Sequence, residues 1–307
     1  MSMPWRGSYT DLFNHMIMKM TLFMKHYLKR IAFAAVLATF SMPSSGWGRL
    51  GHAAINKIAE DHLTATAAKV LDGYMGGESI VTYASWPDDF RDRLNAGFRP
   101  EWNNAKGYAH TFEVDSLLMP YRDIDDNGRY VTNSLYFIEG FISDLKNADG
   151  LDETTRFTEI VMLCHFIGDM HCPGHIRYSP KRDIGGFPVV FLGEKSTYHK
   201  VWDGDILRAY YPWSWSDFAE MCDICDDDGI KAAVEGDIYD WAHDAASASR
   251  TVRMSVKKGD VLDAEWAVDR LDLTREMIRK AGYRLAHSLN MLFDARYARK
   301  HKAYIMK

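Results

Sequence analysis

The sequence has no excess of basic residues. It contains 37 Lys and Arg against 42 Asp and Glu in 307 residues, a formal net charge of -5. A protein that holds nucleic acid along a basic stripe places many Lys and Arg against the phosphates, so this composition argues against that mode of binding. Bound cations would reverse the local sign of the charge. Internal repeats and low-complexity runs are also absent from the sequence.

Cysteine is scarce. The four cysteines, Cys164, Cys172, Cys222 and Cys225, would allow three pairings in an oxidising compartment. Only Cys222 and Cys225 are close in sequence, and a disulfide between them is left open. A thioredoxin-like redox role is not favoured for this CxxC pair, because no strand–helix pattern of that kind precedes it.

Hydrophobic runs long enough to span a bilayer comfortably are missing near the N-terminus, where Ile31–Phe40 is too short. Basic residues precede this segment and small residues follow it: Lys25, Lys29 and Arg30, then Ser44 and Gly46. This order is typical of a secretory signal peptide. We therefore predict that residues 1–46, an upstream extension and a signal peptide, are removed, with Met24 as an alternative start. Trp47 then becomes the first residue of a secreted or periplasmic protein, with a free α-amino group that could bind a metal.

Alternating strand patterns are almost absent from residues 47–307, whereas apolar residues recur at helical spacing. The pattern predicts a mainly α protein. Helices are expected at 51–74, 133–147, 152–171 and 230–254, and a long closing helix carries Leu271 to Leu292 on one face. Long loops are expected at 76–130 and 173–200, where only Pro188–Leu192 resembles a strand, one without an evident partner.

The helix expected at 152–171 is apolar nearly all round, yet it contains His165 and Asp169. Residues four apart lie on one face of a helix, so the two side chains project together into the interior. Burying them unpaired would cost several kcal/mol. A hydrogen-bonded His–Asp pair in a structural core is the simplest explanation for one such pair.

Further imidazole and carboxylate side chains accompany this pair. His175 follows shortly after it, and His199 with Asp203 repeats the His-xxx-Asp spacing. Upstream lie Asp88, two residues after Trp86, and His110. Imidazole and carboxylate together are a ligand set that suits zinc and leaves positions for water in a catalytic site.

Taken in order, these residues resemble the S1/P1 nucleases, trinuclear zinc enzymes of the phospholipase C superfamily. The matching positions are Trp47-Gly48-x-x-Gly51-His52, Trp86-x-Asp88, His110, His165-x-x-x-Asp169, Pro173-x-His175, His199-x-x-Trp202-Asp203 and Ala281-Gly282-Tyr283-Arg284-Leu285-Ala286. The resemblance covers essentially the whole of residues 47–307. It implies one catalytic domain with the multi-helix phospholipase C/P1 nuclease fold and long loops around a zinc cleft.

The resemblance also implies three zinc ions per chain. Trp47, through its α-amino nitrogen and carbonyl oxygen, and His52 would hold one ion, which Asp169 bridges to a second. Asp88, His110 and His165 would complete the second ion. His175, His199 and Asp203 would hold the third.

In such an enzyme the metals activate water for in-line attack on phosphorus and stabilise the leaving 3′ oxygen. Asp169 would serve catalysis by bridging the paired ions, and Arg91 would neutralise charge developing on the phosphoryl oxygens. The implied reaction is hydrolysis of single-stranded DNA and RNA to 5′-phosphate products, with 3′-nucleotidase activity as a further possibility. We expect a monomer without stable membrane association.

The chain departs from the family pattern near the expected substrate site. Many family members have an aromatic residue directly after the histidine that matches His110, whereas this chain has Thr111, followed by Phe112 and Glu113. The family's usual Gly-Gly-Asn is replaced by Gly185-Gly186-Phe187. These residues are our candidates for substrate binding. Phe187 either stacks on a base or packs in the core. Two interpretations stand for Cys172, a zinc ligand or a small buried residue, and we favour the second.

Other polar residues are interpreted structurally. His62, His171 and His243 are expected at the surface or as helix caps. Asp123–Gly128 and Asp226–Gly229 are expected to be turns. Two alternative functions remain: a phospholipase C acting on lipid headgroups, and a catalytically weak protein that binds metal or nucleotides. Asp203 argues against the first, because the phospholipases use glutamate there. The complete ligand set argues against the second.

Overall fold

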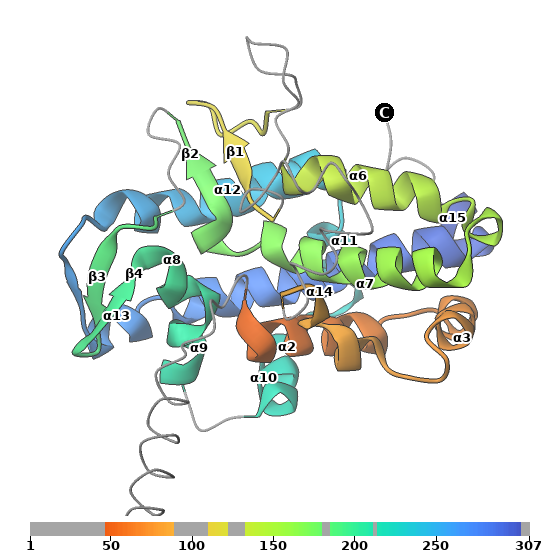
Figure 1. The fold of residues 1–307 in the computed structure, drawn as a ribbon, viewed down its shortest axis with the longest axis horizontal. Helices are drawn as coiled ribbons and strands as arrows, with labels where there is room; N and C mark the ends of the chain where they lie inside the picture. The colour runs from red at the N-terminus through yellow and green to blue at the C-terminus, as the bar shows by residue number, and fades with distance from the viewer. Residues whose placement is uncertain (1–46, 89–109, 122–132, 180–184, 211–213, 302–307) are drawn as a thin grey trace, which may run out of the picture. The chain divides into compact units, whose positions relative to one another are not determined.

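The computed structural model describes residues 47–88, 110–121, 133–179, 185–210 and 214–301. Within these ranges the structure is mainly helical, as predicted (Figure 1). None of the helices described there is both long and apolar enough to cross a membrane.

Three helices form the centre of the described fold. These are α2 (Gly48–Asp61), α7 (Glu153–Met170) and α14 (Leu271–Phe293), and each packs on the other two (Figure 1). In α7, every residue from Thr158 to Met170 is buried, which explains why its sequence is apolar nearly all round. Asp152 caps this helix, because its side chain accepts a hydrogen bond from the Thr155 backbone nitrogen.

Close contact between α14 and α2 depends on Gly282. A Cβ atom at this position would lie 2.5 Å from Ile58 Cγ2 and 3.2 Å from the Ile55 carbonyl oxygen. The absence of a side chain therefore lets the two helices approach each other. This contact holds α2, which carries His52, in a fixed position.

The remaining helices surround this centre. Helix α6 (Ser134–Leu145) packs on α7, and α10 (Trp215–Cys222) packs on α2. The helices that pack on α14 are α3 (Ala65–Tyr74), α11 (Asp227–Ala233), α12 (Ile238–Ser255) and α15 (Ala295–Lys300). Shorter elements are η1 (Ile80–Tyr83), η2 (Ala148–Gly150), η3 (Pro173–His175), α8 (Tyr198–Lys200), η4 (Val201–Asp205), α9 (Ile206–Ala209) and α13 (Ala264–Val268).

Two of the predicted helices are each divided in the structure. The segment 51–74 breaks at 62–64, where the Thr64 side chain accepts a hydrogen bond from the Ala67 backbone nitrogen and begins α3. The segment 230–254 breaks at 234–237, where Asp237 and Asp240 form a capping box that begins α12. Side-chain caps therefore decide both boundaries. The predictions for α6, α7 and α14 are confirmed.

Short strands lie in the two segments predicted to be loops. The strand β1 (Phe112–Val114) pairs in parallel with β2 (Ile176–Tyr178). The strand β3 (Pro188–Phe191) pairs with β4 (Glu194–Thr197) and, in parallel, with β5 (Val261–Leu262). The strand at 188–192, for which the sequence showed no evident partner, therefore has two. One of them, β5, lies about seventy residues further along the chain, so local sequence could not reveal it.

Candidate metal centre

Asp169 lies at the centre of a buried group of imidazoles. Its Oδ2 is 3.3 Å from His165 Nε2, one turn earlier on α7. Its Oδ1 is 3.3 Å from His52 Nε2 on α2 and 3.5 Å from His175 Nδ1 on η3. The His165 and Asp169 side chains therefore meet, as the spacing predicts, and two further elements add an imidazole each.

His165 is oriented by the backbone. Its Nδ1 donates a hydrogen bond to the Ala84 carbonyl oxygen at 2.9 Å, while its Nε2 is 3.4 Å from Asp88 Oδ1. A neutral ring in this tautomer directs the Nε2 lone pair at two carboxylates, an arrangement that requires a proton or a metal cation between them. Burial alone would lower the pKa of His165, but Asp169 and Asp88 outweigh it and raise that pKa to about 9.

The pKa of His52 shifts in the opposite direction to that of its neighbour His165. Its ring stacks on His165, with centroids 3.9 Å apart. Burial and the nearby His165 lower the pKa of His52. A neutral imidazole is the form that binds a metal, so His52 is available as a ligand near neutral pH.

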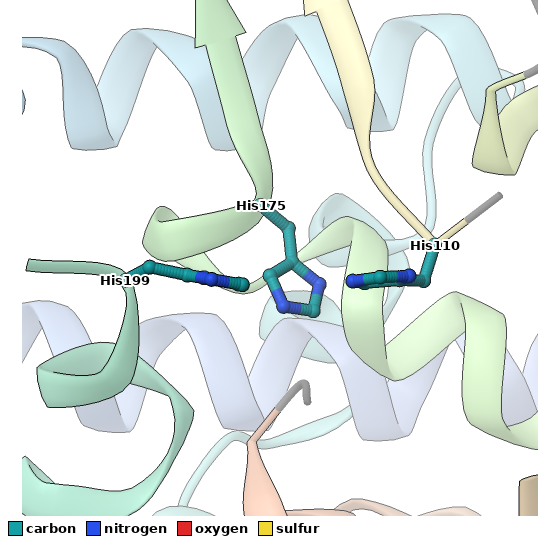
Figure 2. Close-up of side chains that lie close together, drawn as sticks. All are labelled: His110, His175 and His199. Atoms are coloured by element: carbon teal, nitrogen blue, oxygen red, sulfur yellow. The ribbon is translucent and has the colours of Figure 1, made fainter. Parts of the chain in front are cut away.

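A second group of imidazoles lies beside the first. His110 precedes β1, His175 ends η3 and His199 lies in α8, and their rings converge (Figure 2). Asp203 Oδ1 is 3.1 Å from His175 Nε2 and 3.4 Å from His199 Nε2. Burial, followed by the neighbouring His110 and His199, holds the pKa of His175 well below its usual range.

The donor atoms fit bound cations. Three sets have ligand atoms within 4.8 Å of one another: His52–Asp88–His165, His110–His175–His199 and Cys172–His175–Asp203. Among the described residues, neither nitrogen of His52 and neither carboxylate oxygen of Asp169 has a hydrogen-bond partner. Such burial is costly, and divalent cations would offset it.

The structure brings eight predicted site residues to these groups or next to them. Asp169 contacts three of them, His52, His165 and His175. The other four are Asp88 beside His165, and His110, His199 and Asp203 around His175. Trp47 heads α2 with a fully buried ring that packs edge-on against Trp202, the residue before Asp203. Arg91 lies outside the described residues. The bound metal and the role of each ligand stay predictions.

Cys172 is a member of the third set that the predicted ligand list omitted. Its side chain is fully buried, in agreement with the packing interpretation, yet its thiol also lies beside His175 and Asp203. Burial and the Asp203 carboxylate raise the pKa of this thiol well above its usual range. The structure therefore places Cys172 in the core and next to potential ligands at once.

The predicted substrate-binding residues lie on and beside β1. Thr111 is buried, and its Oγ1 accepts a hydrogen bond from Arg177 Nε at 3.2 Å. Phe112 is only 1% exposed and belongs to the hydrophobic core. Glu113 is directly opposite Arg177 in the strand register. Arg177 was not among the predicted residues, because its place depends on the pairing of two three-residue strands.

Phe187 packs against the edge of the hydrophobic core. It is half-buried and stacks on Tyr198, with ring centroids 5.6 Å apart and planes 20° apart. The Arg253 guanidinium carbon lies 5.0 Å from its ring centroid. A role for Phe187 in base stacking stays a prediction.

Histidines outside these groups have structural contacts. His62 lies beside Asp223, with an oxygen 3.0 Å from Nε2, and His243 donates to the Leu118 carbonyl oxygen. His171 ends α7 and donates to the Ile167 carbonyl oxygen, which confirms a cap. His171 is nevertheless fully buried rather than at the surface. Its buried Nε2 is satisfied because it accepts a hydrogen bond from Arg284.

Two other predictions have a structural outcome. Asp226 is the N-cap of α11, which confirms a turn beside a helix start. Cys222 and Cys225 are free thiols in the structure. Asp123–Gly128 lies outside the described residues.

Comparisons with known proteins show similarity over most of the chain. A family model described as S1/P1 Nuclease matches residues 47–294. Endonuclease 2 from Arabidopsis thaliana is 27% identical, over 81% of this chain and 91% of the relative. Nuclease P1 from Penicillium citrinum is 25% identical, over 82% of this chain and all of the relative. Nuclease S1 from Aspergillus oryzae is 23% identical, over 84% and 96%.

Proposed function

Because the chain belongs to the S1/P1 nuclease family, whose membership indicates a hydrolase acting on nucleic acid, we propose a more specific function for it. It is a zinc-dependent phosphodiesterase that hydrolyses single-stranded DNA and RNA to 5′-phosphate products and also removes phosphate from 3′-nucleotides. The observation that carries this proposal is the buried Asp169 carboxylate, which faces imidazoles from three separate elements.

Zinc is the proposed cofactor, with three ions per chain. Trp47, His52 and Asp169 would hold one ion, and Asp88, His110, His165 and Asp169 the second. His175, His199 and Asp203 would hold the third. When bound, the zinc ions would supply a nucleophile near neutral pH, by lowering the pKa of water to roughly 7, and would stabilise charge on the phosphoryl group.

The protein's own residues set the geometry for this reaction. The Ala84 carbonyl oxygen holds the His165 ring, so that Nε2 faces Asp88 and Asp169. The Asp169 carboxylate contacts His165 on its own helix, α7, and His52 on α2, so it links the two helices at the site. Arg91 is the proposed cation for the phosphoryl oxygens. Positive charge in the cleft lets an acidic protein bind phosphodiesters.

Substrate contacts are proposed for the β1 segment and the loop before β3. Thr111 and Glu113 lie on β1 or directly before it and meet Arg177, so hydrogen bonding to a base or sugar is their proposed role. Phe187 would stack on a base. Phe112 would act from the core by supporting β1.

The proposed mature protein comprises residues 47–307 as one catalytic domain. Residues 1–46 would act as a signal peptide with an upstream extension, and the family match likewise begins at Trp47. The mature protein is then secreted or periplasmic, monomeric and without stable membrane association.

Residues 47–307, loaded with zinc, should be assayed in parallel on single-stranded DNA, 3′-AMP and a phosphatidylcholine analogue. We expect about three zinc ions per chain by elemental analysis and activity on the first two substrates. Asp169→Asn should lose more activity than the roughly 10- to 100-fold typical of residues that only orient ligands. Asp272→Asn is the matched control, because that side chain is 98% exposed.

Three results would contradict the proposal. Cleavage of the phosphatidylcholine analogue alone would assign the protein to lipid headgroups. Unchanged activity of Asp169→Asn on DNA would place the reaction elsewhere. One zinc ion or none would remove the trinuclear site.

A further inference from the structure

A cavity of about 460 Å³ is lined by residues that neighbour the candidate metal ligands in the sequence, and it has no role in the site described above. Its volume falls within the roughly 300–1,000 Å³ of ligand pockets. Its walls come from α2, η1 and the residue before it, the turn and the first helical residue that follow η1, and the start of α10. The polar and aromatic residues that line it are Arg49, Ser79, Thr82, Ser85, Trp86 and Trp215.

The cavity and the metal centre share the same short segments of chain. On α2, Ala53 lines the cavity and directly follows His52. Ser85 directly follows Ala84, whose carbonyl oxygen accepts the hydrogen bond from His165. Trp86 comes two residues before Asp88.

The lining has the chemistry of a site for one nucleotide of a single strand. Trp86 is held by an edge contact with Phe157, at a centroid distance of 5.9 Å. Trp215 is 39% exposed, and the capping box of Ser214 and Asp217 fixes the first turn of its helix. Indole faces stack on any base, and the planar guanidinium of Arg49 matches a phosphate. The hydroxyl groups of Thr82 and Ser85 add partners for a sugar, whereas the Ser79 hydroxyl already donates to Glu60 Oε2 and accepts from the Val81 backbone nitrogen.

We propose that this cavity binds one nucleotide of a single-stranded substrate, next to the phosphodiester that is cleaved. The base stacks on Trp215 and the phosphate pairs with Arg49. This inference rests on the proposed nuclease function and deepens it, because it makes oligonucleotides better substrates than 3′-mononucleotides, which have no second nucleotide to place in the cavity.

The test compares two substrates in each variant. For Trp215→Ala we expect KM for a single-stranded oligonucleotide to rise roughly 5-fold or more, since stacking on one aromatic residue contributes a factor of that size. Arg49→Ala should also raise this KM, because it removes the cation that pairs with the phosphate. The KM and kcat for 3′-AMP should stay unchanged. Trp215→Phe should recover most of the loss, because phenylalanine keeps a stacking face.

The control is Arg299→Ala, which removes the same charge from an exposed position on α15. It should behave like the unaltered protein on both substrates. Thermal unfolding of every variant checks that the fold is retained.

Three outcomes would overturn the inference. Unchanged oligonucleotide KM in both cavity variants would show that the cavity is not used. Equal losses on the oligonucleotide and on 3′-AMP would show that the variants damage the metal centre. An unaltered protein that cleaves neither substrate would instead refute the proposed function, and the cavity assignment with it.

Discussion

The pKa values of two buried histidines on or beside α7 are shifted in opposite directions because their neighbours differ. Two carboxylates raise the pKa of His165 to about 9, despite the opposing effect of burial. Burial and Arg284 lower the pKa of His171 to about 3, although it lies only six residues further on. The carboxylates around His165 therefore stabilise positive charge there, whereas His171 accepts a hydrogen bond from Arg284 and joins α7 to α14.

At the residue scale, a free nitrogen on Trp47 is the sharpest requirement. A peptide fused directly ahead of Trp47 turns its α-amino group into an amide, which is a poor metal ligand. We expect this fusion to lower the zinc content by about one ion per chain, measured by elemental analysis, and to reduce cleavage of single-stranded DNA. The same peptide at the C-terminus is the control. Full zinc content and full activity in the N-terminal fusion would refute a role for this nitrogen.

At the scale of elements, the site depends on how closely three helices pack. Gly282 allows contact between α14 and α2, and Gly168 on α7 faces α2, where a Cβ atom would lie 2.9 Å from His52 Nδ1. Small residues at both contacts hold His52 against His165 and Asp169. Packing in the core and geometry in the metal centre therefore rest on the same helix.

Gly282→Ala should destabilise the protein by about 1–3 kcal/mol, because the added methyl group overpacks against Ile58. Gly73→Ala on α3 is the matched control: nothing lies within 4 Å of its added Cβ, so helix propensity should stabilise the protein by up to about 1 kcal/mol. Urea unfolding of both variants measures the difference. A stabilised Gly282→Ala variant would contradict tight packing at this contact.

At the scale of the whole molecule, the candidate metal centre joins segments that are far apart in sequence. Its residues come from α2, the helical residues 86–88, the segment before β1, α7, η3, α8 and η4. Among the described residues, both ring nitrogens of His52 and both carboxylate oxygens of Asp169 are buried without hydrogen-bond partners, which is costly in the absence of cations. Metal binding should therefore stabilise the fold as a whole.

Removal of metal should lower the thermal unfolding temperature. Zinc at about 1,000 times its dissociation constant stabilises a one-site protein by about 4 kcal/mol, or roughly 8 to 16 °C at this size. Thermal scans with chelator and after return of zinc measure the shift. Asp169→Asn should show a smaller shift. An unfolding temperature that ignores chelator would show that these groups are satisfied without metal.

The sequence by itself determined what depends on local geometry. The i, i+4 spacing was enough to bring His165 and Asp169 onto one helix face, and the apolar surroundings were enough to predict their burial. Tertiary structure alone decided which distant groups face them. It placed His52 on the His165 ring, Arg177 opposite Glu113, and β5 beside β3. Each of these contacts depends on packing between segments far apart in the chain, which periodicity along the sequence cannot encode.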